Sequence, residues 1–347
     1  MARVNVTIIG LQRLGASLGL ALKRLMKEPG QKHEFVIVGN DEKPSAMDAA
    51  LKLGAIDQKV RDLETAVENA DLVFITAPYS LASDIFSIIG PAIKAGAVVM
   101  DMSPLKLAAI DWAKKYFRRN KDGEYEAYLV GVTPIVNPEH LEGLRGDTES
   151  ARADLFDNGQ FVISPAPDCP EEAVQLIADL AGLLNIRLHF VDPAEHDGLV
   201  AAMEQLPALL QLAFFRSLSI SKAWTDLQRM GNPRFALATY LLAQESPEDL
   251  ARPIFQNRDN AVRALETLIG TLDEIRDLLV SGDELALEQA FTDASRTYER
   301  WQAARHKNSW GDQPERPAMP SASLMGSLGS MFNPFGKKKS KDDDRQK

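Results

Sequence analysis

The sequence has little that would support a disulfide framework, a metal centre or a nucleic-acid-binding surface. Its 347 residues include one cysteine, Cys169, which excludes an internal disulfide and a cysteine-rich metal site. The five histidines are not spaced with cysteine or carboxylates as metal ligands are, so we expect no bound metal. The formal net charge is −10 and no basic face precedes about the last dozen residues, which argues against a nucleic-acid partner.

Segments typical of membrane or secreted proteins are also missing. No apolar run reaches about 18 residues, and the first strand-like run begins too near Met1 to leave room for a signal peptide. We therefore expect a cytoplasmic location. The sequence contains neither a P-loop nor a nucleophile elbow, the signatures of phosphate-binding loops and of serine hydrolases on α/β folds.

What the sequence does contain is a strand, a tight turn and a helix at its N-terminus. The run VTIIGLQRLG, Val6 to Gly15, leads into an apolar-periodic segment at 16–27. Such a turn presents backbone N–H groups at a positive helix end, which suits a pyrophosphate. We therefore predict a dinucleotide-binding turn, made by Gly10, Leu11, Gln12, Arg13, Leu14 and Gly15.

The fingerprint of this turn is incomplete. A Gly-x-Gly-x-x-Gly pattern needs glycine at position 12, where the chain has Gln12. That glycine lets the pyrophosphate approach the backbone, so a side chain there is expected to weaken or displace the cofactor, and Arg13 offers a compensating charge. The alternative is a Rossmann-like domain that no longer binds a dinucleotide.

The next strand ends in residues that favour NAD as the cofactor. The run 35–39 is followed by Asn40 and Asp41. An acidic residue at this strand tip accepts hydrogen bonds from the ribose hydroxyls and repels a 2′-phosphate, which makes NADP less suitable than NAD. Asp41 could equally cap a helix that begins at Pro44, and the two roles are compatible.

Further apolar runs alternate with helical segments and predict an α/β fold with a doubly wound parallel sheet. The runs at 71–78, 97–103 and 128–134 are read as strands, and a strand, helix and strand at 161–192 complete a Rossmann-like domain at 1–192. Ligands bind at the carboxyl ends of such strands. The residues expected there are Thr76, Ala77, Pro78, Ser103 and Thr133.

From residue 193 to 307 the hydrophobic period changes to three and four, which predicts an all-helical domain. Its long apolar stripes favour a homodimer, against the alternative that they are buried within one chain. Residues 308–347 are rich in Gly, Pro, Ser and charge and are expected to form a disordered tail. Apolar residues at 324–335 followed by lysines at 337–341 could form an amphipathic helix for an anionic membrane or a partner, and the alternative is a solvated tail.

The order of these pieces resembles the prephenate and arogenate dehydrogenase family of tyrosine biosynthesis over roughly residues 4–305. The matching segments are VTIIGLQRLGASLGLALK, VGNDEKP, ADLVFITAP, DMSPLK, ADLF, and DPAEHD followed by Gln205-Leu206-Pro207. The resemblance implies NAD(P)-dependent oxidation of prephenate or arogenate with loss of CO2. It also implies a nucleotide-binding domain and a helical dimerisation domain.

The sequence departs from the family pattern at the residues that the resemblance assigns to catalysis and substrate binding. Family members carry histidine at the positions of Thr133 and Gln205, serine one position after Ser103, and an anion-binding arginine near Tyr240 or Leu241. The pre-proline histidine is the implied base that takes the ring hydroxyl proton as hydride leaves. Threonine can accept a hydrogen bond but cannot hold a proton near neutral pH.

His140, seven residues after Thr133, is the histidine that we expect could substitute as the base, and a surface role is its alternative. His196 with Asp197 is read as a cap or packing residue, and the other histidines as structural or solvated. The sequence therefore leaves two functions open. One is a dehydrogenase with a small-molecule substrate and Thr133, Ser103, His140 and Gln205 at its active site. The other is a catalytically inactive dinucleotide-binding relative that acts as a sensor or scaffold.

Overall fold

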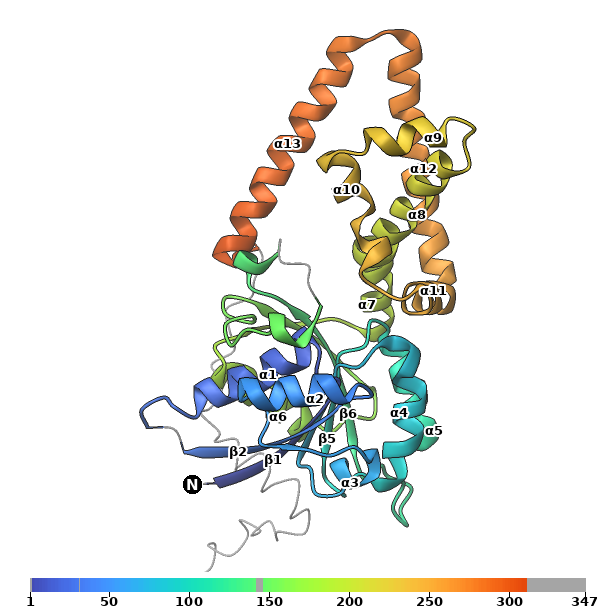
Figure 1. The fold of residues 1–347 in the computed structure, drawn as a ribbon. Helices are drawn as coiled ribbons and strands as arrows, with labels where there is room; N and C mark the ends of the chain where they lie inside the picture. Colours follow the sequence, from blue (N-terminus) through green and yellow to red (C-terminus); the bar gives the residue numbers. More distant parts are fainter. Residues whose placement is uncertain (1, 31, 142–145, 311–347) are drawn as a thin grey trace, which may run out of the picture.

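The computed structural model describes residues 2–30, 32–141 and 146–310, which form a sheet part and a helical part (Figure 1). One eight-stranded sheet has the order β3-β2-β1-β4-β5-β6-β7-β8. Its strands are β1 (Ala2–Ile9), β2 (His33–Asn40), β3 (Gln58–Lys59), β4 (Leu72–Ile75), β5 (Val98–Asp101), β6 (Tyr128–Ile135), β7 (Gln160–Pro165) and β8 (Arg187–Phe190).

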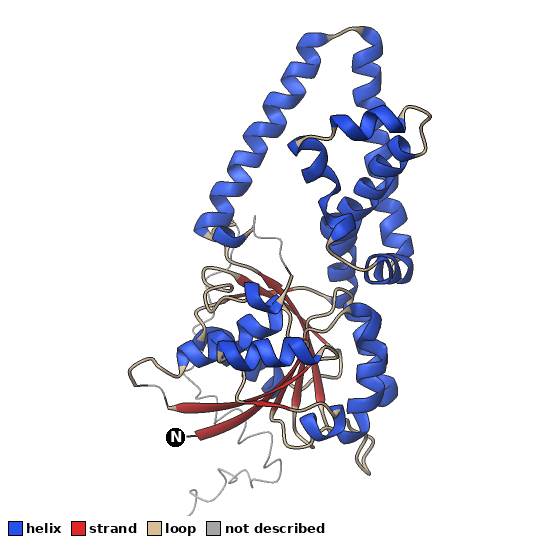
Figure 2. Cartoon of the chain, in the orientation of Figure 1, coloured by secondary structure: helices blue, strands red, loops and turns tan. Residues whose placement is uncertain are grey.

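Helices cover both faces of this sheet (Figure 2). They are α1 (Arg13–Leu25), α2 (Pro44–Leu53), α3 (Leu63–Val67), α4 (Tyr79–Ala92), α5 (Lys106–Tyr116) and α6 (Glu171–Leu183). Side chains of β4 alternate between the two cores: Phe74 packs in the core with α1 and α6, and Val73 in the core with α4 and α5. A strand buried on both faces explains why this run is apolar at every position.

The prediction of an α/β doubly wound sheet is confirmed, with one correction to its parallel character. β7 runs antiparallel to β6, with Thr133 opposite Val162, whereas the other neighbouring strands are parallel. A parallel neighbour needs a crossover connection, usually a helix. In the described residues between β6 and β7 the only helices are the one-turn 3-10 helices η1 (Pro138–His140) and η2 (Thr148–Ser150), so the chain turns back.

The helical part begins at Pro193. Its elements are α7 (Pro193–Val200), the π-helix η3 (Ala201–Gln205), α8 (Leu206–Ser219), α9 (Trp224–Leu227), η4 (Gln228–Met230), α10 (Pro233–Thr239), η5 (Tyr240–Ala243), α11 (Pro247–Gln256), α12 (Arg258–Ser281) and α13 (Glu284–Lys307). The predicted breaks are present. Ser246 caps α11 by accepting from the Asp249 N–H, and Gly282 ends α12 with a left-handed φ of 72°.

Large apolar side chains of the helical part remain open to solvent in the single chain. Among the most exposed are Met203, Leu237, Phe255, Leu279 and Phe291. Helix α13 leaves its hairpin with α12 and returns to the sheet part, standing apart from α8 and α10 (Figure 1). The continuous helix 193–219 is also long and apolar enough to cross a membrane by length and composition, which is weak evidence for a membrane span. A second chain packed on these exposed side chains would remove them from water.

The end of α13 is fastened to the sheet part through Asn308, which corrects the predicted start of the tail. Asn308 is buried, and its side-chain amide donates to the carbonyl oxygens of Asn158 (3.2 Å) and Gly159 (2.9 Å). The Arg187 guanidinium donates to the Asn308 carbonyl oxygen. The proposed amphipathic segment 324–341 lies outside the described residues.

We expect Asn308→Gly to lower the free energy of unfolding by about 1–3 kcal/mol, because it removes both amide bonds while tolerating the left-handed φ of 45° at this position. Asn308→Asp should cost more, since it turns an acceptor toward two carbonyl oxygens. Urea unfolding is the measurement and Ser309→Ala, at an exposed position, is the matched control. Equal stability of all four proteins would place residue 308 in the tail after all.

Candidate active site

The N-terminal turn is built by two glycines that the fold itself requires. Gly10 has φ +94°, and a Cβ there would lie 2.4 Å from the Ala77 nitrogen. A Cβ on Gly15 would lie 1.9 Å from the Gly10 oxygen and 2.5 Å from Thr76 Oγ1. The Thr76 hydroxyl in turn donates to the Gly10 carbonyl oxygen at 2.6 Å. Both glycines therefore allow the turn to pack on the end of β4, whether or not a ligand is bound.

Position 12 has no such backbone requirement. Gln12 precedes α1 with φ −67° and ψ −172°, a conformation open to any residue, and its side chain makes no capping bond. A glycine at this position would serve only the close approach of a ligand. The neighbouring backbone is partly engaged: the Arg13 N–H donates to the Gly146 oxygen (2.9 Å), and the Thr148 hydroxyl donates to the Leu11 oxygen (2.8 Å).

The end of β2 lies against this turn. Asp41 Oδ2 accepts from the Leu11 N–H at 2.7 Å, and Asp41 Oδ1 accepts from the Lys43 N–H at 2.8 Å, just before α2 begins. The capping alternative for Asp41 is wrong, because Lys43 holds the N-cap position of α2 and no side chain caps that helix. Asp41 forms a turn just before the helix, and its carboxylate is held beside the N-terminal turn. Asn40 has a structural role, because its side-chain amide donates to the carbonyl oxygens of Val60 and Arg61.

A buried polar cluster lies where β5 and β6 end. We define it as Asp101, Ser103, Lys106, His196 and Asp197, each 4% exposed or less. The Lys106 ammonium donates to the carbonyl oxygens of Asp101 (3.3 Å), Ser103 (2.6 Å) and Val132 (3.0 Å). Its stem fits because Gly131 has no side chain: a Cβ there would lie 2.8 Å from Lys106 Cδ. Lys106 therefore ties the two strand ends together.

Two helices of the sheet part receive their N-terminal caps from the helical part. Asp197 on α7 accepts from the N–H groups of Lys106 (2.8 Å) and Leu107 (3.1 Å), at the start of α5. Asp249 on α11 accepts from the Ser80 N–H at 2.8 Å, at the start of α4. The residues at the cap positions, Leu105 and Pro78, provide no side-chain cap of their own. Carboxylates at positive helix ends hold the two parts in register.

The cluster continues to Thr133 at the carboxyl end of β6. Thr133 Oγ1 lies 2.7 Å from His196 Nε2, and His196 Nδ1 lies 3.1 Å from Asp197 Oδ1. An ionised carboxylate can only accept, so the Nδ1 nitrogen carries the proton. In the neutral imidazole Nε2 then carries no proton and accepts from the Thr133 hydroxyl. We call this arrangement the Thr133–His196–Asp197 chain.

The structure brings Ser103 close to this chain. Its hydroxyl donates to Asp101 Oδ2 at 2.6 Å. Gln205 is buried and turned toward α11 and α12, donating to the Pro253 oxygen (3.2 Å) and accepting from the Asn257 amide (3.0 Å). His140 lies on η1 with Nε2 3.3 Å from an Asp154 oxygen, and in the described contacts Thr133 meets His196 rather than His140.

Sequence reasoning missed Asp101 and Lys106 as members of the site and read His196 with Asp197 as a cap or packing residue, of which the cap is confirmed by the bonds from α5 to Asp197. The available signals were an acidic residue ending a fully apolar strand, in VVMD, and the paired His196-Asp197. Burial raises the pKa of Asp101 and lowers that of Lys106, and their mutual attraction opposes both shifts. Asp101 Oδ1 has no hydrogen-bond partner among the described residues. Perturbed titratable groups of this kind gather at functional sites.

Two further groups at the boundary between the parts have raised pKa values. Burial raises the pKa of the Tyr79 hydroxyl, which is hydrogen-bonded to the Gln256 side chain, and the charges of Asp101 and Asp197 add to the shift. The protein packed around the carboxyl group raises the pKa of Glu204, against the charges of Lys106 and His196, although the residue as a whole is exposed.

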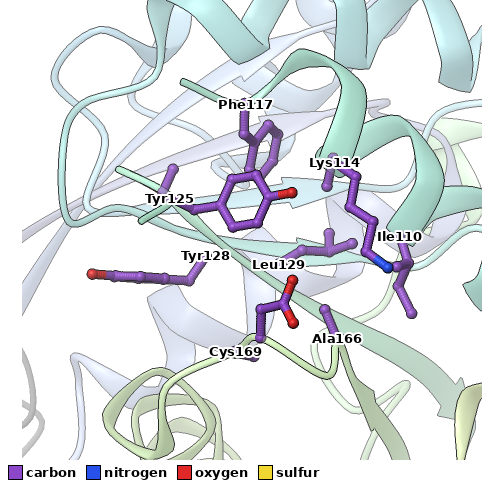
Figure 3. Close-up of a pocket in the computed structure, with 11 residues that line it drawn as sticks. Ile110, Lys114, Phe117, Tyr125, Tyr128, Leu129, Ala166 and Cys169 are labelled. Carbon is purple, nitrogen blue, oxygen red and sulfur yellow. The ribbon is translucent and has the colours of Figure 1, made fainter. Parts of the chain in front are cut away.

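A small hollow at the opposite end of β6 does not belong to this site (Figure 3). It is lined by α5, the start of β6 and the loop after β7, including Lys114, Tyr128 and Cys169. Its volume of about 20 Å³ admits roughly one water molecule. Burial raises the pKa of Cys169 to about 12, so its thiol is not a nucleophile at neutral pH.

Two family models match successive parts of the chain. "Prephenate dehydrogenase, nucleotide-binding domain" matches residues 22–189, beginning after the N-terminal turn. "Prephenate dehydrogenase, dimerization domain" matches residues 192–293.

The chain is also similar to individual dehydrogenases, both in sequence and in structure. The chain is 24% identical to the prephenate dehydrogenase of Bacillus subtilis over 84% of this chain and 74% of that protein. It is 23% identical to the cyclohexadienyl dehydrogenase of Zymomonas mobilis, over 84% and 94%. Prephenate dehydrogenase from A. aeolicus, solved with hydroxyphenyl propionate and NAD+, superposes with a TM-score of 0.72 at 19% identity, covering 86% of this chain and 99% of that one. Synechocystis arogenate dehydrogenase gives 0.64 at 19% identity, covering 86% and 100%.

We expect Lys106→Met to lower the free energy of unfolding by about 3–5 kcal/mol, because it removes the hydrogen bonds to three carbonyl oxygens and leaves the Asp101 carboxylate without its neighbouring positive charge. Adding Asp101→Asn should recover part of that loss, so the double variant should be more stable than the sum of the single effects. A double-mutant cycle by urea unfolding measures this coupling. Strict additivity would show that the two charges do not stabilise each other.

Proposed function

Because the chain belongs to the prephenate dehydrogenase family, we propose that it is an NAD-dependent oxidoreductase acting on a hydroxycyclohexadienyl carboxylate of the prephenate or arogenate class, with loss of CO2. One observation carries the proposal. The Thr133–His196–Asp197 chain ends at the same edge of the sheet as the Gly10–Gly15 turn, because β1, β4, β5 and β6 are parallel. That edge is where ligands of doubly wound folds bind. A proton-accepting group and a cofactor turn on one edge are what oxidation of a hydroxyl requires.

The residues present can hold a dinucleotide. The positive N-terminus of α1 suits the pyrophosphate, with Leu11, Gln12, Arg13 and Leu14 beside it. Before a ligand binds, the N–H groups of Leu11 and Arg13 donate to Asp41 and Gly146. Asp41 is positioned for the adenosine ribose, and Thr76, Ala77 and Pro78 border the nicotinamide end at the start of α4. When bound, NAD accepts the hydride from the substrate carbon. The chain's own residues orient the substrate, exclude water and manage its hydroxyl proton.

The substrate is proposed to lie at the carboxyl end of β6, on the side of Thr133 that faces away from His196. Thr133 faces its hydroxyl, the buried Ser103 and Asp101 lie beneath the site, and Gln205 supports the wall made by α11 and α12. His140 is given no role in this site, and its Nε2 lies 3.3 Å from Asp154 Oδ1. The helical part is proposed to close this site against water. Its carboxylates Asp197 and Asp249 bind N–H groups at the N-termini of α5 and α4.

We further propose a homodimer in the cytoplasm. The match of the helical part to a dimerization domain supports it, as do the exposed apolar side chains on α8, α10, α12 and α13. A second copy of the same helices would cover surface that this chain leaves open.

A second candidate is a dinucleotide-binding relative without catalysis, acting as a sensor or scaffold. The turn favours it in one respect: Gly10 and Gly15, which packing demands, are kept, and the glycine that only a ligand needs is replaced by Gln12. Calorimetric titration with NAD, NADP, prephenate and arogenate, together with turnover assays, separates the two. NAD reduction with prephenate or arogenate supports the enzyme. Cofactor binding without turnover supports the sensor, and binding of no cofactor supports the scaffold.

We expect NAD to bind more tightly than NADP, and Asp41→Asn to reduce that preference by about tenfold or more. The amide keeps one acceptor oxygen, so it can still accept from either the Leu11 or the Lys43 N–H, but it no longer repels a 2′-phosphate. The measurement is the ratio of the two dissociation constants at fixed ionic strength. Glu42→Gln, one residue away and exposed, is the matched control for charge alone. Tighter binding of NADP by the wild type would contradict the prediction.

Gln12→Gly should tighten NAD binding by about tenfold, because it clears the approach of the pyrophosphate without needing a new backbone conformation. Gln12→Ala should fall between the two, since it keeps the Cβ alone. If affinity drops in both variants, the Gln12 side chain is itself a cofactor ligand.

A further inference from the structure

Oxidising a hydroxyl-bearing carbon requires a group that takes the hydroxyl proton as the hydride leaves. Thr133 stands at the end of β6 where that proton would be released, but a threonine hydroxyl cannot keep a second proton near neutral pH. Its hydrogen-bond partner can. The imidazole of His196 lies 2.7 Å away, and histidine is the side chain whose ordinary pKa is nearest to neutrality.

Thr133 and His196 differ in burial, so a substrate can reach only one end of the Thr133–His196–Asp197 chain. His196 is 3% exposed, so a bound substrate cannot reach its imidazole directly, whereas Thr133 is only partly buried. The Thr133 hydroxyl donates to Nε2 and keeps its lone pairs for a donor on the other side. A substrate hydroxyl is such a donor. Thr133 is therefore the accessible end of the chain, and His196 is the end that can hold charge.

Resting on the function proposed above, we propose that His196 is the base of the reaction and that Thr133 transmits the proton to it. The substrate hydroxyl proton passes to Thr133 Oγ1 while the Thr133 proton passes to His196 Nε2, and the hydride passes to the nicotinamide. The ring carbonyl forms, and the bond to the ring carboxylate then breaks to release CO2 and leave an aromatic phenolate. The proton returns from His196 through Thr133 to that oxygen, so protons and electrons balance.

Asp197 is the positioning residue of this chain. Its Oδ1 accepts from His196 Nδ1, which leaves Nε2 facing Thr133, and the carboxylate is itself held by the N–H groups of Lys106 and Leu107. Negative groups face the imidazole from three elements: Asp101 on β5, Asp197 on α7 and Glu204 on η3. Lys106 on α5 is the positive group of the same cluster.

The test compares variants that remove the hydroxyl, the imidazole or neither. Thr133→Val keeps the shape without the hydroxyl, Thr133→Ser restores the hydroxyl, and His196→Gln removes the base. His140→Ala is the matched control on the other candidate histidine. Single-turnover rates with NAD and prephenate or arogenate are measured from pH 5.5 to about 9, with NAD affinity and far-ultraviolet circular dichroism as checks that each variant is folded and loaded.

We expect Thr133→Val and His196→Gln each to lower the rate by about 10²–10⁴-fold with NAD affinity unchanged. The double variant should be no slower than the worse single variant, because the two residues act as one unit. Thr133→Ser should stay within about tenfold of the wild type, and His140→Ala should be unaffected. His196→Gln should also abolish the fall in rate at acid pH, since that fall reports protonation of the base.

Wild-type turnover that survives Thr133→Val, or that His140→Ala abolishes, overturns this proposal and leaves the proposed function standing. Should His196→Gln fail to fold, the Thr133→Val and Thr133→Ser pair decides the question alone. A wild type that binds NAD but turns over neither substrate overturns the proposed function, and the base assignment with it.

Discussion

The carboxylate of Asp197 is the contact on which the arrangement of this molecule depends. It closes the N-terminus of α5, where Lys106 and Leu107 would otherwise present unpaired N–H groups, and it fixes the tautomer of His196. Capping α5 stabilises the sheet part, and fixing the tautomer of His196 prepares the site. Asp197 does both from α7, the first helix of the helical part. Because the same oxygens serve both tasks, the two parts cannot separate without uncapping α5 and releasing the imidazole. Asp249 on α11 caps α4 in the same way, by accepting from the Ser80 N–H.

The polar cluster beneath that carboxylate shows how a charged site is kept at the end of buried strands. Lys106 satisfies its three donors with three carbonyl oxygens, so its charge is placed by backbone geometry and not by a flexible partner. Gly131 is needed because the lysine stem occupies the space that a side chain would fill. A buried cation held in this way stabilises the Asp101 carboxylate nearby, in a region where water cannot do so.

The N-terminal turn separates what a fold needs from what a ligand needs. Gly10 and Gly15 are required by contacts to Ala77 and Thr76 that exist in the protein alone. The backbone at position 12 accepts any amino acid, so only a bound ligand would require glycine there. A fingerprint that keeps the first and third glycines is therefore good evidence for the fold and weaker evidence for the cofactor. The Asp41 carboxylate beside the turn and the family membership are what support a dinucleotide here.

Local chemistry in the sequence determined much of this protein. The strand and helix periods, the caps at Ser246 and Gly282 and the acidic tip at Asp41 are properties of short segments, and each is found in the structure. Other features depend on residues far apart in the chain. The antiparallel β7 follows from a connection without a crossover helix, and Asn308 became an anchor because residues 150 positions earlier offer it carbonyl oxygens. The pairing of Thr133 with His196 was likewise decided only by tertiary structure, since nothing in either segment specifies a partner 63 residues away.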